Sequence, residues 1–184
     1  MLEKSILRRS SGLNDSSTHT LSPLRLLLAT LLLATTLHAA EIQGTVVAVS
    51  DGDTITVLTP AKKQHKIRLL GIDAPEKEQP FGRKSKFSLS DMVYLKEVTV
   101  QTDKQDRYKR DLGKVKVDGK DINLEQIKAG MAWHYKQYQR DQTPDDRKMY
   151  ADAEVAAKKR KVGLWADKKP EPPWEYRKKR EGRK

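Results

Sequence analysis

The sequence contains no cysteine. This absence excludes disulfide bonds, thiolate metal sites and the lipid attachment site of a lipoprotein, so stability must come from packing alone. Histidine is also scarce: two of the four, His19 and His38, lie near the amino terminus, and His65 and His134 are isolated from each other. A zinc site is therefore not indicated. Internal repeats and a glycine-rich phosphate-binding loop are absent as well.

Long apolar runs are scarce, and the one that stands out covers the 12 residues from Leu26 to Leu37. It is too short for an ordinary transmembrane helix. Arg25 precedes it and the small residues Ala39 and Ala40 follow it. This arrangement predicts a signal peptide over residues 1–40 that is cleaved after Ala39 or Ala40, and an uncleaved anchor is the less favoured alternative. We therefore expect a secreted or periplasmic protein without a stable membrane anchor after cleavage.

Charge, by contrast, is abundant and mainly positive. The 184 residues include 37 Lys and Arg against 25 Asp and Glu, and 36% are hydrophobic, which allows one domain with a modest core. Without residues 1–39 the net charge is +10. Such a surplus favours a polyanionic partner, nucleic acid before anionic lipid or glycan. Residues 41–167 are expected to form the domain, and residues 168–184 a basic, proline-rich tail that is disordered.

The pattern of apolar residues and turn residues predicts five short strands. They are Ile42–Val49, Thr54–Leu58, Lys66–Ile72, Glu97–Thr102 and Leu112–Val117. One helix is expected at Arg83–Leu95, a second beginning at the cap Asn123, and a third beginning at the cap Thr143. This order favours an α+β, mainly β class: a five-stranded antiparallel barrel of the OB type with about three helices. A monomer is the default expectation.

Carboxylates gather at the predicted strand ends. Asp51 and Asp53 lie in a turn that, taken alone, is also typical of a simple hairpin. Arg68, Asp73 and Glu76 belong to the stretch Ile67–Glu76, which contains a strand and the turn after it. Arg68 and Asp73 would lie on opposite faces of an ideal strand, so a bend is needed to bring them into one pocket. Carboxylates without cysteine favour a hard cation, Ca²⁺ or Mg²⁺.

These stretches resemble the first signature of the staphylococcal nuclease family: Asp51-Gly52-Asp53-Thr54-Ile55-x-Val57, ten further residues, then Arg68-Leu69-x-x-Ile72-Asp73-x-Pro75-Glu76. The second signature, Asp106–Gly113, is similar but has Lys109 where the family has glycine, and Lys116 follows where an aromatic residue is usual. The resemblance extends from Ile42 to Trp165.

The resemblance implies an OB-type barrel that hydrolyses phosphodiester bonds of DNA and RNA with Ca²⁺ and leaves 3′-phosphate ends. It implies that Asp53, Asp73 and the main-chain carbonyl of Ala74 bind the metal. Glu76 would position or deprotonate the attacking water, while Arg68 and Arg110 would contact phosphate oxygens. Residues that would contact the substrate are Arg107, Tyr108 and Tyr138.

Three alternatives stay open at this point. Arg68 would be a structural residue if it only pairs with Asp73. The glycine usual before Arg110 suggests a left-handed backbone there, in which Lys109 costs about 1 kcal/mol and shifts the arginine. A barrel of this family that has lost catalysis would be a nucleic-acid-binding module. It would lack some of the five residues Asp53, Arg68, Asp73, Glu76 and Arg110, which are all present here.

Overall fold

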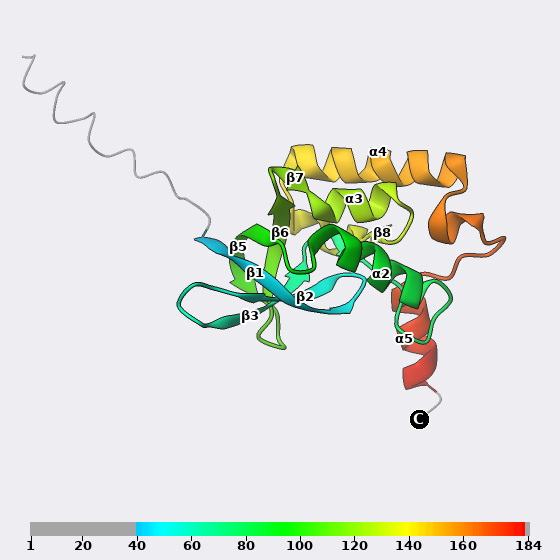
Figure 1. The fold of residues 1–184 in the computed structure, drawn as a ribbon. Helices are drawn as coiled ribbons and strands as arrows, with labels where there is room; N and C mark the ends of the chain where they lie inside the picture. Colours follow the sequence, from blue (N-terminus) through cyan, green and yellow to red (C-terminus); the bar gives the residue numbers. More distant parts are fainter. Residues whose placement is uncertain (1–39, 183–184) are drawn as a thin grey trace, which may run out of the picture. The chain divides into compact units, whose positions relative to one another are not determined.

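β-Branched and apolar residues alternate with polar ones over most predicted strands, and these segments pair into one six-stranded sheet in the computed structural model, which describes residues 40–182 (Figure 1). The order is β3-β2-β1-β5-β6-β7. The strands are β1 (Ala40–Asp51), β2 (Thr54–Leu58), β3 (Gln64–Leu69), β5 (Glu97–Gln105), β6 (Asp111–Val117) and β7 (Lys120–Asp121).

An additional pairing between β3 and β6 closes five of these strands into a barrel. This pairing is parallel, whereas the other pairings of the sheet are antiparallel. The expected five-stranded OB-type barrel is confirmed, with the parallel closure as its one departure from an antiparallel arrangement. Its interior is filled by side chains that are at most 3% exposed, including Val46, Ile55, Val57, Ile67, Leu69, Val98, Val100 and Val115.

The third strand is shorter than its sequence pattern predicts. β3 ends at Leu69, and the chain resumes as β4 (Ile72–Asp73), which leaves the barrel and pairs with β8 (Trp133–His134). Gly71 lies between them with φ +77°, a conformation that glycine adopts without strain. The bend that the separation of Arg68 and Asp73 requires is therefore present, and Gly71 makes it.

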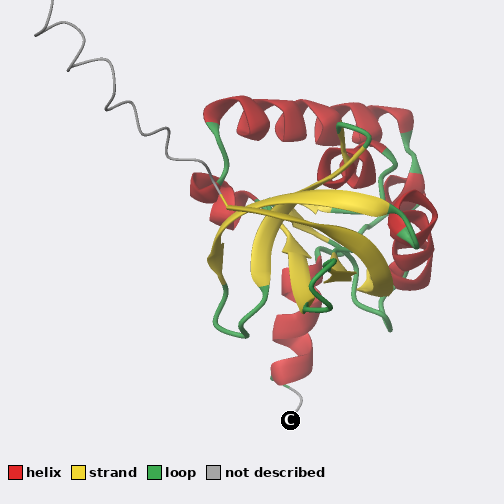
Figure 2. Cartoon of the chain, turned by 60° about the vertical axis from the view of Figure 1, so that its left-hand side comes forward, coloured by secondary structure: helices red, strands yellow, loops and turns green. Residues whose placement is uncertain are grey.

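Four α-helices and two 3₁₀-helices complete the described chain. They are α2 (Gly82–Val93), α3 (Ile122–Lys128), η1 (Lys136–Asp141), α4 (Pro144–Arg160), η2 (Gly163–Ala166) and α5 (Pro173–Glu181). Helix α4 lies above the barrel in both views, whereas α5 lies at its lower right in Figure 1 and below it in Figure 2. None of the helices in residues 40–182 has the length and hydrophobicity needed to cross a membrane. The expected signal peptide covers residues 1–40, of which residues 1–39 lie outside the described residues.

The caps of α3 and α4 differ in how well the sequence predicts them. Thr143 caps α4 as expected, because its side chain accepts a hydrogen bond from the Asp146 amide. The expected cap Asn123 is wrong: the Asp121 side chain caps α3, accepting from the Leu124 amide at 3.0 Å. Asn123 is buried instead, and its amide bonds to the backbone of Leu70, Gly113 and Val115.

Helix α5 replaces the disordered tail that composition predicts. Pro172 and Pro173 begin the helix, since proline needs no amide partner in the first turn. The Trp174 ring stacks on Tyr135 with centroids 5.4 Å apart and meets Trp133 edge-on at 5.6 Å. The aromatic contacts outweigh the polar, charged composition of the tail, so Pro173–Glu181 is ordered.

Candidate active site

The turn between β1 and β2 places Asp53 at the mouth of the barrel. The side-chain amide of Gln126 donates to the Gly52 carbonyl at 2.7 Å, and a Cβ on Gly52 would lie 1.8 Å from the Ser85 hydroxyl, so only glycine fits there. The Asp51 carboxylate accepts from the Asp53 amide at 3.1 Å. Asp51 therefore stabilises the turn, and the Asp53 side chain is turned inward and is buried.

Arg68 joins the two signature stretches. Its Nη1 lies 2.5 Å from Asp53 Oδ2, and its Nη2 donates to Asp73 Oδ1 at 2.7 Å. Asp53 Oδ2 also accepts from the Ala74 amide at 2.7 Å. Both carboxylates are almost completely buried. The structure thus brings together four of the predicted site residues: Asp53, Arg68, Asp73 and Ala74.

The electrostatics of this cluster depend on burial and on the paired charges. Burial raises the pKa of Asp53 well above its ordinary value, although the Arg68 charge acts to lower it. Burial alone would lower the pKa of Arg68, but the Asp53 and Asp73 carboxylates raise it overall. Arg68 therefore stays charged, and the mutual repulsion of the acidic groups makes a further positive charge favourable there.

Glu76 lies at the open side of the same cluster. Its backbone amide donates to Gln79 Oε1 at 3.1 Å, and its side chain is 36% exposed, whereas the Asp73 side chain is 0% exposed. Arg177 of α5 donates from Nη1 to Glu76 Oε1 at 2.8 Å and from Nη2 to Asp73 Oδ2 at 2.8 Å. Burial would lower the pKa of Arg177, but its bonds to Asp73 and Glu76 raise it.

Arg177 is a site residue that the sequence interpretation missed. It lies 104 positions after Asp73, beyond the part of the chain that resembles the nuclease signatures. The available signal was the helix start at Pro172–Pro173 followed by Trp174, because a tryptophan in a polar segment indicates a docking contact.

The second signature lies apart from this cluster. The Asp106 carboxylate accepts from Arg110 Nε at 2.7 Å and from the Tyr108 amide at 2.8 Å. Within residues 40–182, Arg110 forms no hydrogen bond or ion pair with Asp53, Asp73 or Glu76. Lys109 has φ +60°, so the left-handed backbone suggested by the family's glycine is present.

The predicted substrate-contacting aromatics are on the surface. The Tyr108 ring is 65% exposed, with the guanidinium carbons of Arg107 and Arg110 at 5.0 and 5.4 Å from its centroid. Tyr138 is also exposed and meets Tyr135 edge-on at 5.0 Å. Exposed rings beside guanidinium groups are suited to stacking on bases and binding phosphates.

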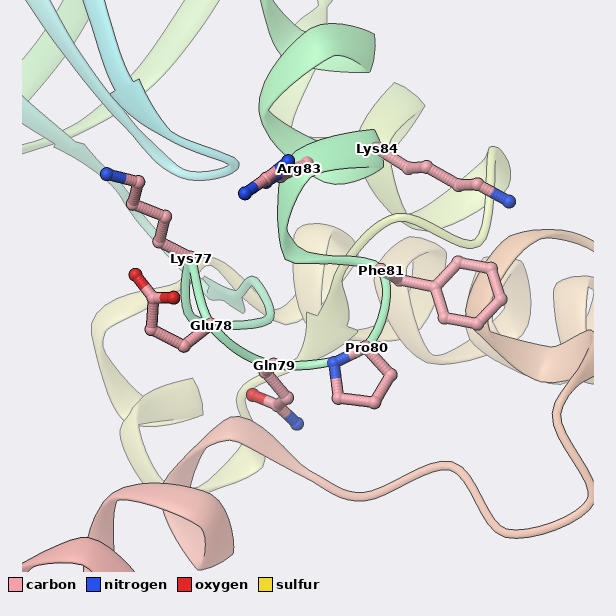
Figure 3. Close-up of a pocket in the computed structure, with 7 residues that line it drawn as sticks. All are labelled: Lys77, Glu78, Gln79, Pro80, Phe81, Arg83 and Lys84. Carbon is pink, nitrogen blue, oxygen red and sulfur yellow. The ribbon is translucent and has the colours of Figure 1, made fainter.

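A pocket of about 470 Å³ is formed by residues 77–84, which follow Glu76 in the chain (Figure 3). Its lining residues are Lys77, Glu78, Gln79, Pro80, Phe81, Arg83 and Lys84. Figure 3 shows the Gln79 side chain directed toward the segment that leads into α5, and its Nε2 donates to the Glu171 carbonyl at 2.6 Å. Three cations, Lys77, Arg83 and Lys84, give this pocket a positive lining that the sequence interpretation did not single out.

The donor set at the cluster fits a hard divalent cation. Within the described residues, no group of three or more His, Asp or Glu side chains is arranged to hold a metal. Asp53 and Asp73 instead offer carboxylate oxygen atoms alone. Asp53, Asp73 and Glu76 face two guanidiniums, Arg68 and Arg177, so the carboxyl groups of this part of the site outnumber the guanidiniums that pair with them. Buried carboxylates need such compensation, which a cation would complete.

The fold and this cluster define an OB-type barrel with an acidic, arginine-bridged site at the strand ends. The chain belongs to the staphylococcal nuclease family, because residues 66–167 match the sequence model of the family described as "Staphylococcal nuclease homologue".

Curated relatives agree with this membership. An "Uncharacterized endonuclease" of Haemophilus influenzae is 46% identical over 83% of this chain and 84% of its own length. A "Micrococcal nuclease" of Shigella flexneri is 36% identical over 85% of this chain and 93% of its own. The "Staphylococcal-like nuclease CAN1" of Arabidopsis thaliana is 40% identical over 65% of this chain and 35% of its own. These findings support a nuclease.

Proposed function

We propose that the protein is a Ca²⁺-dependent nuclease that hydrolyses phosphodiester bonds of DNA and RNA and leaves 3′-phosphate ends. The observation that carries the proposal is Arg68, which bridges the buried carboxylates of Asp53 and Asp73 at 2.5 and 2.7 Å, beside the half-exposed Glu76. Membership of a nuclease family supports the same chemistry.

Asp53, Asp73 and the carbonyl of Ala74 would hold the cation. When bound, it supplies positive charge where the phosphate gains negative charge during attack. Arg68 Nη1 is buried and, within residues 40–182, has no well-aligned hydrogen-bond acceptor, although Asp53 lies close to it. This nitrogen lies 2.5 Å from Asp53 Oδ2, so it would have to exchange that carboxylate for a phosphate oxygen when substrate is bound.

Glu76 is proposed to act on the attacking water molecule. Its carboxylate is partly open to solvent, so it can orient a water molecule and take its proton as the oxygen attacks phosphorus. The bond between phosphorus and the 5′ oxygen then breaks, the 5′ oxygen leaves as a hydroxyl after taking a proton from solvent water, and the phosphate stays on the 3′ side.

Arg110, Tyr108, Arg107 and Tyr138 are proposed substrate contacts. Arg110 is bound to Asp106 at 2.7 Å, so it must exchange this partner for a phosphate oxygen when substrate is present. Lys77, Arg83 and Lys84, which line the pocket, would extend the positively charged path for the nucleic-acid strand. We also propose that the protein acts as an exported monomer.

The proposal is tested by incubating purified protein with single-stranded DNA and with RNA in Ca²⁺, in Mg²⁺ and in chelator. We expect cleavage in Ca²⁺, none in chelator, and products whose 5′ hydroxyls accept label from polynucleotide kinase without phosphatase treatment. Undiminished cleavage in chelator, or products with 5′-phosphate ends, would contradict it.

The second candidate is a non-catalytic nucleic-acid-binding module. The formal net charge of +12 and the basic pocket favour binding of a polyanion by themselves. Folded protein that binds DNA but cuts it under none of the ions would establish this candidate. The intact set of Asp53, Arg68, Asp73, Glu76 and Arg110 favours the enzyme.

A further inference from the structure

Arg177 binds the carboxylates of both Asp73 and Glu76, which have different roles in the proposed reaction. A single nitrogen, Nη1, donates to Glu76 Oε1 at 2.8 Å and to Asp73 Oδ1 at 3.2 Å, while Nη2 donates to Asp73 Oδ2 at 2.8 Å. The guanidinium is a rigid, planar fork. It therefore fixes the position of Glu76 relative to Asp73.

The helix that carries Arg177 is docked at several points. Trp174, one turn before Arg177, stacks on Tyr135 and meets Trp133 edge-on. Just before α5, the Glu171 carbonyl accepts from Gln79 Nε2 at 2.6 Å, and Gln79 Oε1 accepts from the Glu76 amide. The contacts of α5 thus reach both the backbone and the side chain of Glu76.

Glu76 depends on this support more than the aspartates do. Asp53 and Asp73 are buried and are held by Arg68. The Glu76 side chain is 36% exposed, and among the described residues Arg177 is the one ion-pair partner of its carboxylate. Without Arg177 this side chain would sample several rotamers, and few of them would place its oxygen next to the attacking water.

We propose that Arg177 is a positioning residue that holds Glu76 against Asp73, so that helix α5 completes the hydrolytic site; this rests on the proposed function. The two carboxylates keep their separation because one guanidinium binds both. The segment after the barrel is then part of the active enzyme rather than an appendage.

The full-length protein is compared with Arg177→Ala, Arg177→Lys and Arg180→Ala on single-stranded DNA at saturating Ca²⁺. Arg180 is the matched control: it is an exposed arginine of the same helix, and in residues 40–182 it has no ion pair. We expect Arg177→Ala to lower kcat by about 10- to 100-fold with little change in KM, because orientation rather than binding is lost.

Four further measurements test positioning against a purely structural role. Arg177→Lys should recover part of kcat, since it keeps the charge without the fork. In a Glu76→Gln background, Arg177→Ala should change kcat by less than about 2-fold, because residues that act together are not additive. Trp174→Ala, which loosens α5 and keeps Arg177, should lower kcat in the same direction. Calorimetric titration without DNA should give a Ca²⁺ affinity for Arg177→Ala within about 5-fold of the wild type, since the ligands remain.

One result would overturn the proposal: the Arg177→Ala variant is at least as active as the wild type and binds Ca²⁺ at least about 10-fold more tightly. Arg177 would then compete with the cation for the site. Equal additive losses in the wild-type and Glu76→Gln backgrounds would also overturn it. Wild-type protein that cuts nothing would remove the proposed function itself, whereas an active wild type with an unimpaired Arg177→Ala variant removes this inference alone.

Discussion

His134 lies buried on β8, directly opposite Ile72 and next to the pairing partner of Asp73. Its Nε2 bonds to Gln142 Oε1 at 2.9 Å, whereas its Nδ1 is buried and, within residues 40–182, has no hydrogen-bond partner. Burial lowers the pKa of His134 below 6.5, and the hydrogen bond with Gln142 only partly opposes this. The folded protein therefore favours the neutral form of the His134 ring.

This predicts a pH dependence of stability. Between the lowered pKa and 6.5 the unfolded chain binds more protons than the folded one, so the free energy of unfolding is highest above pH 6.5 and falls below it. Each unit of lowering contributes about 1.4 kcal/mol. Urea unfolding of the wild type and His134→Gln between pH 7.5 and 5.5 measures how the free energy of unfolding depends on pH. The same dependence on pH in both proteins would contradict the prediction.

Side chains were predictable where a motif assigns them and not where only the fold brings them together. Asp53, Arg68 and Asp73 share two short stretches, and they meet as expected. Arg177 could not be assigned in this way, because its partners lie about a hundred positions earlier and the basic tail contains three arginines and five lysines. The burial of Asn123 was likewise hidden, since asparagine before a helix is an equally good cap.

Among the secondary-structure elements, the site depends most on the break between β3 and β4. Gly71 has φ +77°, and a Cβ there would lie 2.4 Å from Gln142 Nε2. Gln142 also bonds to His134, so a displaced Gln142 would disturb the pairing of β4 with β8. Asp73 is the last residue of β4, so the accuracy of its position follows from this bend.

We therefore predict that Gly71→Ala destabilises the protein more than a left-handed backbone alone explains. Gly119→Ala is the matched control, because Gly119 has the same φ of +77° and no atom within 4 Å of the added Cβ. The control should cost about 1–2 kcal/mol, and Gly71→Ala about 1 kcal/mol more. Denaturant unfolding measures both. Equal losses would show that the contact with Gln142 does not matter.

At the level of elements, periodicity and caps predicted the barrel strands and the helices α2, α3 and α4 but not α5, since apolar alternation and caps are local signals. The position at which the third strand ends was wrong by a few residues, because the apolar run Leu69–Leu70 continues through the bend. Glycine at position 71 was the local sign of it.

For the whole molecule, the charge surplus predicted a basic domain with a disordered carboxyl-terminal tail and not the docking of that segment. Composition averages over the segment from Lys168 onward, whereas docking depends on Trp174 and on the acidic cluster that Arg177 meets. The site is therefore assembled from the barrel mouth, the loop after β4 and α5.

The central claim is that the carboxylates at the barrel mouth form a hydrolytic site, and Glu76→Gln tests it most directly. Cleavage of single-stranded DNA and binding of the same DNA are measured in Ca²⁺ for the wild type and the variant. We predict a loss of cleavage rate of about 100-fold or more, with DNA affinity and thermal stability almost unchanged, since glutamine keeps the shape and loses the base. A variant that cleaves at the wild-type rate would contradict the account.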